Sequence, residues 1–578
     1  MNKITVADYF VEFLIANGVT DVFGYQGGMI AYIFDSMGKP QYRDKISYHS
    51  CGNEQGAALA ACSYAQTSGK LGVAISTSGP GFTNMLTGIA NAWFDSIPVL
   101  FVSGNVNTKD KRRNSGFRQN GFQEIQAAPM AAPVTKHAEE IELTTDYAEC
   151  FNNAIKIAMT DRRGPVYLDL PINVCREMVE FESIEPFKMP DIEEYDATWY
   201  LNGLNVYEKP VIIAGAGIKQ AECPGEFREL VEKLGIPVVT TMPAIDLLPS
   251  DSPYMMGYIG GTARREAGIV LQNADFVLSI GTRLCSKQVG HNMALFAPKA
   301  KKFIRVDIDE TEFERKLKSD EVDVKANLRT FMKSAVKFAN NYTQKHERWS
   351  KNCTEMRDML RDADMTSANR MCRDITGMIP EDVNLIFDVG KNLTYATQSS
   401  IIKKNSRVLF SAGLGTMGYS IPAAIGAYYG NHKLSYVITG DGGAQMNIQE
   451  LNTIVKNNIP TKIFVLNNKA LGNIRLFQEN FLDRHYVATG EKEGDYFSCD
   501  FVAVAKAYGM KAFKLNDVAE LRGHSDVLTS SESVLFEIEY DDCPALPGIA
   551  AGGEFLKEGT GISRDMAAKI TQLMEEQP

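Results

Sequence analysis

The chain has 578 residues, which is too long for one hydrophobic core and predicts about three or four domains. Its 44% hydrophobic and 23% charged residues are ordinary for a globular protein. The formal net charge of -11 argues against nucleic acid as the main partner, because a phosphate-binding surface needs clustered Lys and Arg.

The sequence carries no sign of secretion or membrane insertion. Residues 1–18 lack both an uninterrupted apolar stretch and a small-residue cleavage site. Apolar runs such as 97–102 are far shorter than the roughly 18 residues of a membrane span. Ten cysteines are scattered without a C-x-x-C pair, which is typical of free thiols in a reducing compartment. We therefore expect a cytoplasmic protein without a membrane partner.

Helix and strand signals alternate through the N-terminal segment. Residues 5–17 carry apolar side chains at helical spacing, and an Ala-rich helix is predicted over 53–68. Apolar strands are predicted over 71–76 and 99–103. This alternation predicts a parallel sheet with helices on both faces, which is the doubly wound α/β class.

Two further α/β domains are predicted beyond this segment. A Pro- and acid-rich stretch, 182–194, lacks periodicity and is interpreted as a linker. A polar stretch, 344–373, is the predicted crossing to the last domain. The expected units are 1–181, 195–343 and 374–550, with 551–578 as a tail. The predicted strands are 211–214, 238–241, 276–280 and 303–308 in the second unit, and 385–388, 436–439, 462–466 and 534–538 in the third.

The strongest chemical signal runs from Gly440 to Asn468, in the segments GDGGAQMNIQE and FVLNN. Asp441 follows one predicted strand and Asn468 follows the next, so both belong at the ligand-binding edge of a parallel sheet. Carboxylate and amide oxygens suit Mg²⁺, which keeps positions open for phosphate oxygens. Gly442 and Gly443 let the backbone approach a diphosphate, and the following helix offers its N-terminus.

Each of these dipeptides alone is typical of a turn. Together they resemble the motif of thiamine-diphosphate enzymes, a GDG followed by a terminal NN. Glu54, in NEQGA, begins a predicted helix, where a carboxylate is commonly only a partner of the helix dipole. In thiamine enzymes a glutamate at this place hydrogen-bonds the aminopyrimidine ring nitrogen and so promotes loss of the C2 proton. The resemblance implies that role for Glu54.

From about residue 4 to 550 the chain resembles the acetohydroxyacid synthase branch of that family, in segments such as FGYQGG, TSGPGFTN, GFQE and GLGTMGYSIPAAIGA. The resemblance implies a pyrimidine-binding domain, a central domain of the FAD-binding type and a domain that binds the diphosphate and Mg²⁺. It implies a homodimer or a dimer of dimers, with Glu54 and Asp441 of one site on different chains. It also implies that Met417 bends the cofactor. The other implied contacts are Gly390, Lys391, Asn392, Gly415, Gly440 and the carbonyl of Ala470.

A reaction pocket is also implied by the resemblance. Phe477 stands where the synthases carry a Trp that helps to select the acceptor. Lys136 matches a position near the substrate entrance, although it fits a solvated surface charge equally well. The other implied pocket residues are Gly27, Gly28, Phe122 and Gln123.

The central domain holds AGAGIKQ, a Gly-rich turn that is weak evidence for a nucleotide when it stands alone. Other segments resemble the FAD contacts of the synthases, but GYIGG at 257–261 and LCSKQ at 284–288 depart from them. The expected cofactors are thiamine diphosphate and Mg²⁺, with FAD as a third. These departures leave the binding of FAD open. The candidate FAD residues are Gly215, Ala216, Gly217, Thr240, Met242, Gly281, Arg283 and Asp307.

The predicted activity is decarboxylation of a 2-keto acid, such as pyruvate, with transfer of the two-carbon hydroxyethyl or acetyl unit to an acceptor carbonyl. Phe477, Lys391 and Asn392 differ from the synthase pattern and are compatible with a 4-keto nucleotide sugar as acceptor. Alternatives are an ordinary acetolactate synthase using pyruvate or 2-ketobutyrate, a flavin-dependent oxidase and a simple decarboxylase. A non-catalytic cofactor-binding protein is disfavoured because Glu54, Asp441 and Asn468 are all present.

Overall fold

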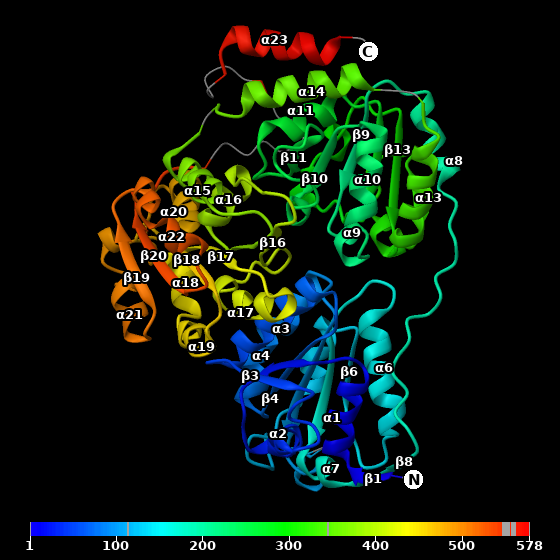
Figure 1. Cartoon of the computed structure of the whole chain (residues 1–578), viewed down its shortest axis with the longest axis vertical. Coiled ribbons are helices and arrows are strands. Elements are labelled where there is room, and N and C mark those ends of the chain that lie inside the picture. Colours follow the sequence, from blue (N-terminus) through cyan, green and yellow to red (C-terminus); the bar gives the residue numbers. More distant parts are fainter. Residues whose placement is uncertain are drawn as a thin grey trace.

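The computed structural model describes residues 2–112, 115–343, 346–363, 365–545, 555–556 and 562–576. Three six-stranded parallel sheets flanked by helices form three domains (Figure 1). The short strands β1 (Asn2–Thr5) and β8 (Met178–Phe181) pair antiparallel and tie together the two ends of the first domain. The predicted class, three doubly wound parallel-sheet domains, is confirmed.

The first sheet has the strand order β3-β2-β4-β5-β7-β6. Its helix α3 (Glu54–Ser68) begins where the Asn53 side chain accepts a hydrogen bond from the Gln55 N–H, and it ends at Gly69 in the left-handed conformation. The strands are β2 (Asp21–Gly24), β3 (Ser47–Ser50), β4 (Gly72–Ser76), β5 (Val99–Asn105), β6 (His137–Glu140) and β7 (Val166–Pro171). The other helices are α1 (Val6–Ala16), α2 (Ala31–Gly38), α4 (Pro80–Phe94), α5 (Ala127–Ala131), α6 (Tyr147–Met159) and α7 (Ile172–Arg176).

The central sheet has the order β11-β10-β9-β12-β13-β14, which is the arrangement of dinucleotide-binding folds. Its strands are β9 (Pro210–Ala214), β10 (Val238–Thr241), β11 (Met255–Ile259), β12 (Phe276–Ile280), β13 (Lys302–Asp307) and β14 (Val322–Lys325). Its helices are α8 (Thr198–Leu201), α9 (Gly217–Gln220), α10 (Pro224–Leu234), α11 (Arg265–Asn273), α12 (Ser286–Val289), α13 (Leu328–Asn340) and α14 (Glu347–Leu360).

The third sheet has the order β16-β15-β17-β18-β20-β19, which repeats that of the first when strands are numbered within each domain. Its strands are β15 (Asn384–Phe387), β16 (Arg407–Leu409), β17 (Ser435–Gly440), β18 (Thr461–Asn467), β19 (Lys511–Leu515) and β20 (Val534–Glu539). Its helices are α15 (Ser367–Met378), α16 (Lys391–Ser399), α17 (Ser420–Asn431), α18 (Asp441–Met446), α19 (Glu450–Lys456), α20 (Gly472–Phe481), α21 (Phe501–Ala507) and α22 (Ser525–Thr529).

The first and third domains meet where α3 packs against α17 (Figure 1). A side chain at Gly426 would place its Cβ 1.8 Å from the Ala60 carbonyl oxygen, so this glycine allows the two helix backbones to approach closely. The interface joins two domains that lie more than 350 residues apart in sequence. It fixes the beginning of α3, where Glu54 lies, relative to the third sheet.

The predicted polar crossing is more regular than its composition indicates. It contains α14, whose buried Trp349 donates to the Pro210 carbonyl at 3.0 Å. Part of the predicted tail, 551–578, lies outside the described residues. The part that is described forms the amphipathic helix α23 (Arg564–Glu575), which packs along α14 (Figure 1). No helix in the described part of the chain has the length and apolar composition needed to cross a membrane.

Candidate active site

Asp441 lies at the carboxyl edge of the third sheet, where β17 ends and α18 begins. Its side chain is buried, and the Tyr496 hydroxyl donates to its Oδ2 at 2.9 Å. Burial raises the pKa of Asp441 to about 6, while the Tyr496 hydroxyl and backbone N–H groups, including that of Ala470, act in the opposite direction. A cation beside this carboxylate would favour its ionised form.

The two asparagines at the end of β18, Asn467 as its last residue and Asn468 just beyond it, have different environments. The Asn467 amide donates to Glu537 at 2.7 Å, and its oxygen accepts from the Lys469 N–H and the Ser498 hydroxyl. Asn468 instead donates from Nδ2 to Asp542, at 3.1 Å. Since Leu466 is in register with Gly440, the ends of β17 and β18 are neighbours at one edge. The Asn467 side chain is therefore fully used by hydrogen bonds within the fold. Asn468 is the side-chain amide beside Asp441 that has an oxygen left for a ligand.

Some of the predicted glycines at this edge leave no room for a side chain, and others have a backbone conformation that favours glycine. A Cβ at Gly442 would lie 3.1 Å from the Met417 methyl carbon, so Met417 reaches toward the beginning of α18. A Cβ at Gly443 would lie 2.6 Å from Asp388 Oδ1. Gly390 and Gly415 have φ angles of 142° and 75°, which disfavour residues with a Cβ. The backbone can thus approach a ligand closely here.

Asp388, which our sequence analysis did not select, shapes the loop that carries Met417. It follows β15, is fully buried, and accepts from the N–H groups of Gly418 and Ser420 and from the Ser420 hydroxyl. Burial raises the pKa of Asp388, while these donors lower it. The sequence signal was present, since Asp388 ends the predicted strand 385–388 and stands two residues before Gly390, an implied cofactor contact.

Two of the predicted diphosphate contacts have partners within the protein. Lys391, whose side chain is only 7% exposed, donates to both carboxylate oxygens of Asp542, at 2.9 and 2.8 Å. Asn392 is also buried, and its amide donates to the Asp388 carbonyl at 2.7 Å. Both side chains are therefore engaged before any substrate arrives.

Glu54 is the first residue of α3 and is 9% exposed. Asn84 donates to its Oε2 at 3.0 Å, and a Cβ at Gly81 would lie 3.3 Å from its Oε1. Gly27 lies against Thr77, close enough that a Cβ would be 2.6 Å from the threonine side chain. The first turns of α4 and the beginning of α3 thus form one wall around the glutamate.

The remaining pocket candidates are dispersed. Gln123 has a left-handed φ of 64° and packs on Gly79, near the wall around Glu54, whereas Gly28 begins a short 3-10 turn with open space around it. The Lys136 amine donates to the Thr160 carbonyl at 2.9 Å, and burial lowers the pKa of Lys136. In the described part of the chain, no hydrogen bond or ion pair joins Lys136 to the residues around Glu54.

Within one chain, Glu54 and Asp441 have different hydrogen-bond partners, and no hydrogen bond or ion pair among the described residues links the two. Large apolar side chains are uncovered on both domains. Phe122 of the first domain is 79% exposed, and Phe477 of the third is 53% exposed and packs at a tilt of 40° against the exposed Phe481. Both side chains therefore leave apolar surface in contact with water in the single chain.

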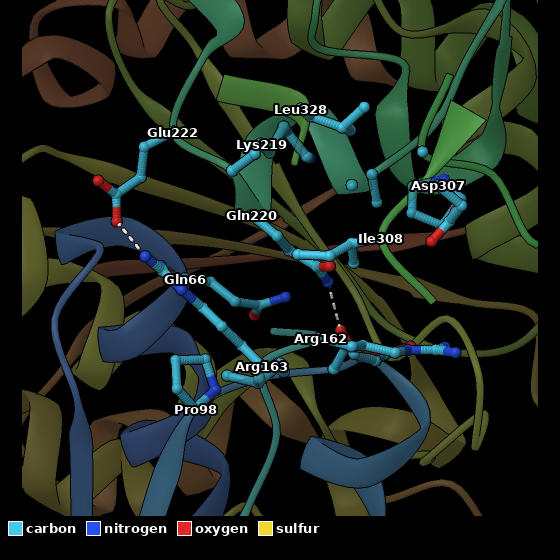
Figure 2. A pocket seen from close by; sticks show the side chains of 18 of the residues that line it. Gln66, Pro98, Arg162, Arg163, Lys219, Gln220, Glu222, Asp307, Ile308 and Leu328 are labelled. Carbon is cyan, nitrogen blue, oxygen red and sulfur yellow. Dashed lines mark hydrogen bonds and ion pairs between the residues drawn. The ribbon is translucent and has the colours of Figure 1, made fainter. Parts of the chain in front are cut away.

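A second candidate site lies between the central domain and the other two. A cavity of about 490 Å³ is bordered there by Ala216, Gly217, Gly281, Arg283 and Asp307, all of them predicted FAD residues. Figure 2 shows Arg162 and Arg163 of the first domain facing Lys219, Gln220 and Asp307 across it. The predicted residues Gly215, Thr240 and Met242 do not border it, although Thr241 does.

Several bridges cross this cavity, among them that of Arg162, which pairs with Glu312 at 2.8 Å. Arg163 pairs with Glu222 at 2.8 Å, and the Gln220 amide donates to the Asp95 carbonyl at 2.7 Å (Figure 2). Burial raises the pKa of Asp307, at the end of β13, to about 6. The volume and the mixed charged and apolar walls fit a nucleotide-sized ligand.

The fold and the two sites define a three-domain α/β enzyme that presents a carboxylate and an amide at a glycine-lined sheet edge. Three family models match the chain: the N-terminal TPP binding domain of thiamine pyrophosphate enzymes at 4–130, their central domain at 200–334 and their C-terminal TPP binding domain at 388–538.

The chain is also similar to acetolactate synthase large subunits. It is 29% identical to the isozyme 2 large subunit of Escherichia coli, over 96% of this chain and 99% of that protein. It is 32% identical to a probable large subunit of Methanocaldococcus jannaschii, over 95% and 94%, and 31% identical to the large subunit of Lactococcus lactis, over 93% and 92%. The chain belongs to the thiamine pyrophosphate enzyme family, in its acetolactate synthase-like branch. It is a thiamine-diphosphate-dependent carboligase or transferase.

Proposed function

We propose that Asp441, the Asn468 amide oxygen and the Ala470 carbonyl hold Mg²⁺, and that the metal anchors the diphosphate of the cofactor. The observation that carries this proposal is the convergence of the Asp441 carboxylate and the Asn468 amide at one glycine-lined sheet edge. Oxygen donors in this arrangement suit Mg²⁺, which retains positions for phosphate oxygens. Gly390, Gly415, Gly442 and Gly443 would admit the diphosphate.

The residues of the chain then divide the work. Glu54 would donate a hydrogen bond to the pyrimidine ring nitrogen, and Met417 would keep the cofactor bent. When bound, thiamine diphosphate supplies a thiazolium that accepts the electron pair released by decarboxylation. We assign pyrimidine binding to 1–181, the nucleotide cleft to 195–343, the diphosphate to 374–550 and no catalytic group to 551–578.

We further propose that the smallest active unit is a homodimer, which can pair into a dimer of dimers. Each site would take Glu54 from one copy and Asp441 from the other. The exposed Phe122 and Phe477 support this proposal, since a second copy would cover apolar surface next to each half of the site.

The reaction that we favour is decarboxylation of pyruvate and transfer of its two-carbon unit to a second 2-keto acid. The similarity to acetolactate synthases supports this choice. Lys391 and Asn392, which the sequence offered as groups for a sugar acceptor, are engaged by Asp542 and Asp388. Phe477 remains as support for a larger acceptor, so a 4-keto nucleotide sugar is the second candidate.

Mass analysis of products tests this assignment. The enzyme would receive pyruvate with 2-ketobutyrate, more pyruvate or a 4-keto-deoxysugar nucleotide as competing acceptors. We expect acetolactate and acetohydroxybutyrate. A branched sugar as main product would favour the second candidate, acetaldehyde alone would indicate a decarboxylase, and acetate with consumption of oxygen would indicate an oxidase.

For the central cavity we propose FAD in a structural role, with Gly217, Gly281, Arg283 and Asp307 among its contacts. The fit rests on the cavity volume and on the strand order of the domain. We also propose a cytoplasmic location, which is supported by ten cysteines that are all free thiols.

A further inference from the structure

The Asp542 carboxylate lies between two side chains of the proposed diphosphate and metal site. Its Oδ1 accepts from Asn468 Nδ2 at 3.1 Å and from Lys391 Nζ at 2.9 Å, and its Oδ2 accepts from the same amine at 2.8 Å. Three segments meet here: the chain after β20, the beginning of α16 and the residue after β18. Asp542 was not among the site residues predicted from the sequence.

The packing holds this carboxylate in place. Lys391 is only 7% exposed and also donates to the Cys543 carbonyl at 3.3 Å. The Tyr395 hydroxyl donates to the same carbonyl. A Cβ at Gly472 would lie 2.8 Å from the Lys391 side chain and 2.9 Å from Asn468 Nδ2, so there is little room for either to move. Asp542 is thus fixed by a buried cation and its neighbouring backbone.

An asparagine can ligate a cation only through its oxygen, because its NH₂ group carries donor hydrogens. A half-turn of the amide exchanges the two atoms with almost no change in shape, so the partner of the NH₂ group decides which atom faces the metal. An ionised carboxylate only accepts hydrogen bonds. Asp542 therefore captures Nδ2 and leaves Asn468 Oδ1 for the cation.

We propose that Asp542 is a positioning residue that orients the Asn468 amide for Mg²⁺, with Lys391 as the group that anchors Asp542. This inference rests on the proposed function, since it takes Asn468 as a metal ligand. Residues that orient metal ligands commonly change metal affinity by about 10–100-fold when they are removed. Asn467 is not proposed as a ligand, because both ends of its amide are already bonded to Glu537, Ser498 and Lys469.

The test is the half-saturating Mg²⁺ concentration for thiamine diphosphate binding, measured by calorimetry on the full-length protein without substrate. Asp542→Ala should raise it by about 10–100-fold. Asp542→Asn should stay within about threefold of wild type, because the new amide oxygen can accept the same bond from Asn468. Asp541→Ala is the matched control: Asp541 is exposed and has no hydrogen bond or ion pair among the described residues, so no change is expected.

A change in ligand chemistry gives an independent measurement. A carboxylate at position 468 presents oxygen whichever way it turns, so in an Asn468→Asp background the removal of Asp542 should cost no Mg²⁺ affinity. Two results would show that Asp542 does not orient the amide. One is that Asp542→Asn loses as much Mg²⁺ affinity as Asp542→Ala. The other is that Asp542→Ala lowers the Mg²⁺ affinity of the Asn468→Asp protein tenfold.

The failure of this inference is distinguishable from failure of the proposed site. If Asp441→Ala and Asn468→Ala lose Mg²⁺ affinity while Asp542→Ala does not, the inference is wrong and the metal site stands. If none of the three variants changes Mg²⁺ affinity, the metal site itself is wrong, and the inference falls with it.

Discussion

The first and third domains share more than a strand order. In the first, Asn105 ends β5 and donates at 2.7 Å to Asp169, a buried residue of β7. In the third, Asn467 ends β18 and donates at 2.7 Å to Glu537, the residue at the matching position of β20. The two domains differ at the next residue, which is Val106 in the first domain and Asn468 in the third. One scaffold thus gains a candidate metal ligand by a single residue beyond a strand end.

The two domains also place their carboxylates differently. The third carries Asp441 directly after β17, at the sheet edge. In the first, the equivalent strand β4 is followed by a loop and α4, and the acid is Glu54 at the beginning of α3. Fold alone therefore does not assign function, and side chains at strand and helix ends do. We give metal binding to the third domain and proton chemistry to the first.

The largest expected effect is on proton chemistry. Glu54→Gln keeps the shape of the side chain but removes the acid, so C2 proton exchange of bound thiamine diphosphate should slow by about 10²–10⁴-fold. The affinity for Mg²⁺ and diphosphate should survive, because both bind in the third domain. Exchange is measured by NMR after a deuterium pulse, and an unchanged rate would remove Glu54 from the mechanism.

The reciprocal change belongs to the third domain. Asp441→Asn should weaken Mg²⁺ binding by about 100-fold or more, because a charged ligand is lost from a buried site. At saturating metal, C2 exchange should be affected far less than in Glu54→Gln. Calorimetric titration with Mg²⁺ in the presence of thiamine diphosphate measures the metal affinity of both variants. Equal losses of C2 exchange in both variants would contradict the assignment of proton chemistry to the first domain and metal binding to the third.

Local signals in the sequence predicted much of this fold. The helix predicted over 53–68 differs from α3 by one residue, because an Asn cap and a terminating Gly are local features. Strand β12 was predicted at its observed bounds, since its apolar run is flanked by turn residues. Helix α14 was missed although its four buried apolar side chains recur at helical spacing, because polar and charged residues dominate the stretch and its partner α23 lies some 200 residues later. The single crossover helix expected after Asp441 is two short helices, α18 and α19.

In the candidate site, too, local sequence signals predicted some residues and tertiary packing revealed the others. Positions after strands could be read from the sequence, which placed Asp441 and Asn468 at one edge. Tyr496 is 55 residues from Asp441 and Asp542 is 74 residues from Asn468, so these partners depend on tertiary packing that no local pattern encodes. Lys391 illustrates the limit: its type indicated a free cation for a substrate, and only the fold pairs it with Asp542.

The central domain has a strand order different from that of the other two domains, and we propose that it binds a different ligand, FAD. We expect purified protein to carry FAD that turnover does not reduce. Arg283→Ala should lower retained flavin by about tenfold, because a cation bordering the cavity is lost. Absorbance after denaturation measures the flavin. Colourless protein that is fully active with only thiamine diphosphate and Mg²⁺ would refute the assignment.

The smallest effect concerns Asp169. Burial raises its pKa to about 7, with Lys111 and Asn105 acting in the opposite direction. Between about pH 4 and 7 the folded protein holds a proton that the unfolded chain has released, so wild-type stability falls as the pH rises. Asp169→Asn has no such titration, and its stability relative to wild type should rise across this window by on the order of 1–3 kcal/mol. Urea denaturation at several pH values measures this.

The control for that experiment is Asp44→Asn, an exposed acid of the same domain. Its stability relative to wild type should not depend on pH. A flat pH profile for Asp169→Asn as well would mean that Lys111 keeps Asp169 ionised in the folded protein.

The central claim is that Glu54 of the first domain and Asp441 of the third act in one site formed by two chains. The direct measurement is to mix Glu54→Gln and Asp441→Asn proteins after dissociation and reassociation. The Mg²⁺ concentration is kept too low to load Asp441→Asn, so that each variant is inactive alone. Random pairing leaves an intact site in every mixed dimer, so activity should return to about a quarter of the wild-type value. If the mixture stays inactive while mass spectrometry detects mixed dimers, the two carboxylates serve a site within one chain, and our account of the assembly is contradicted.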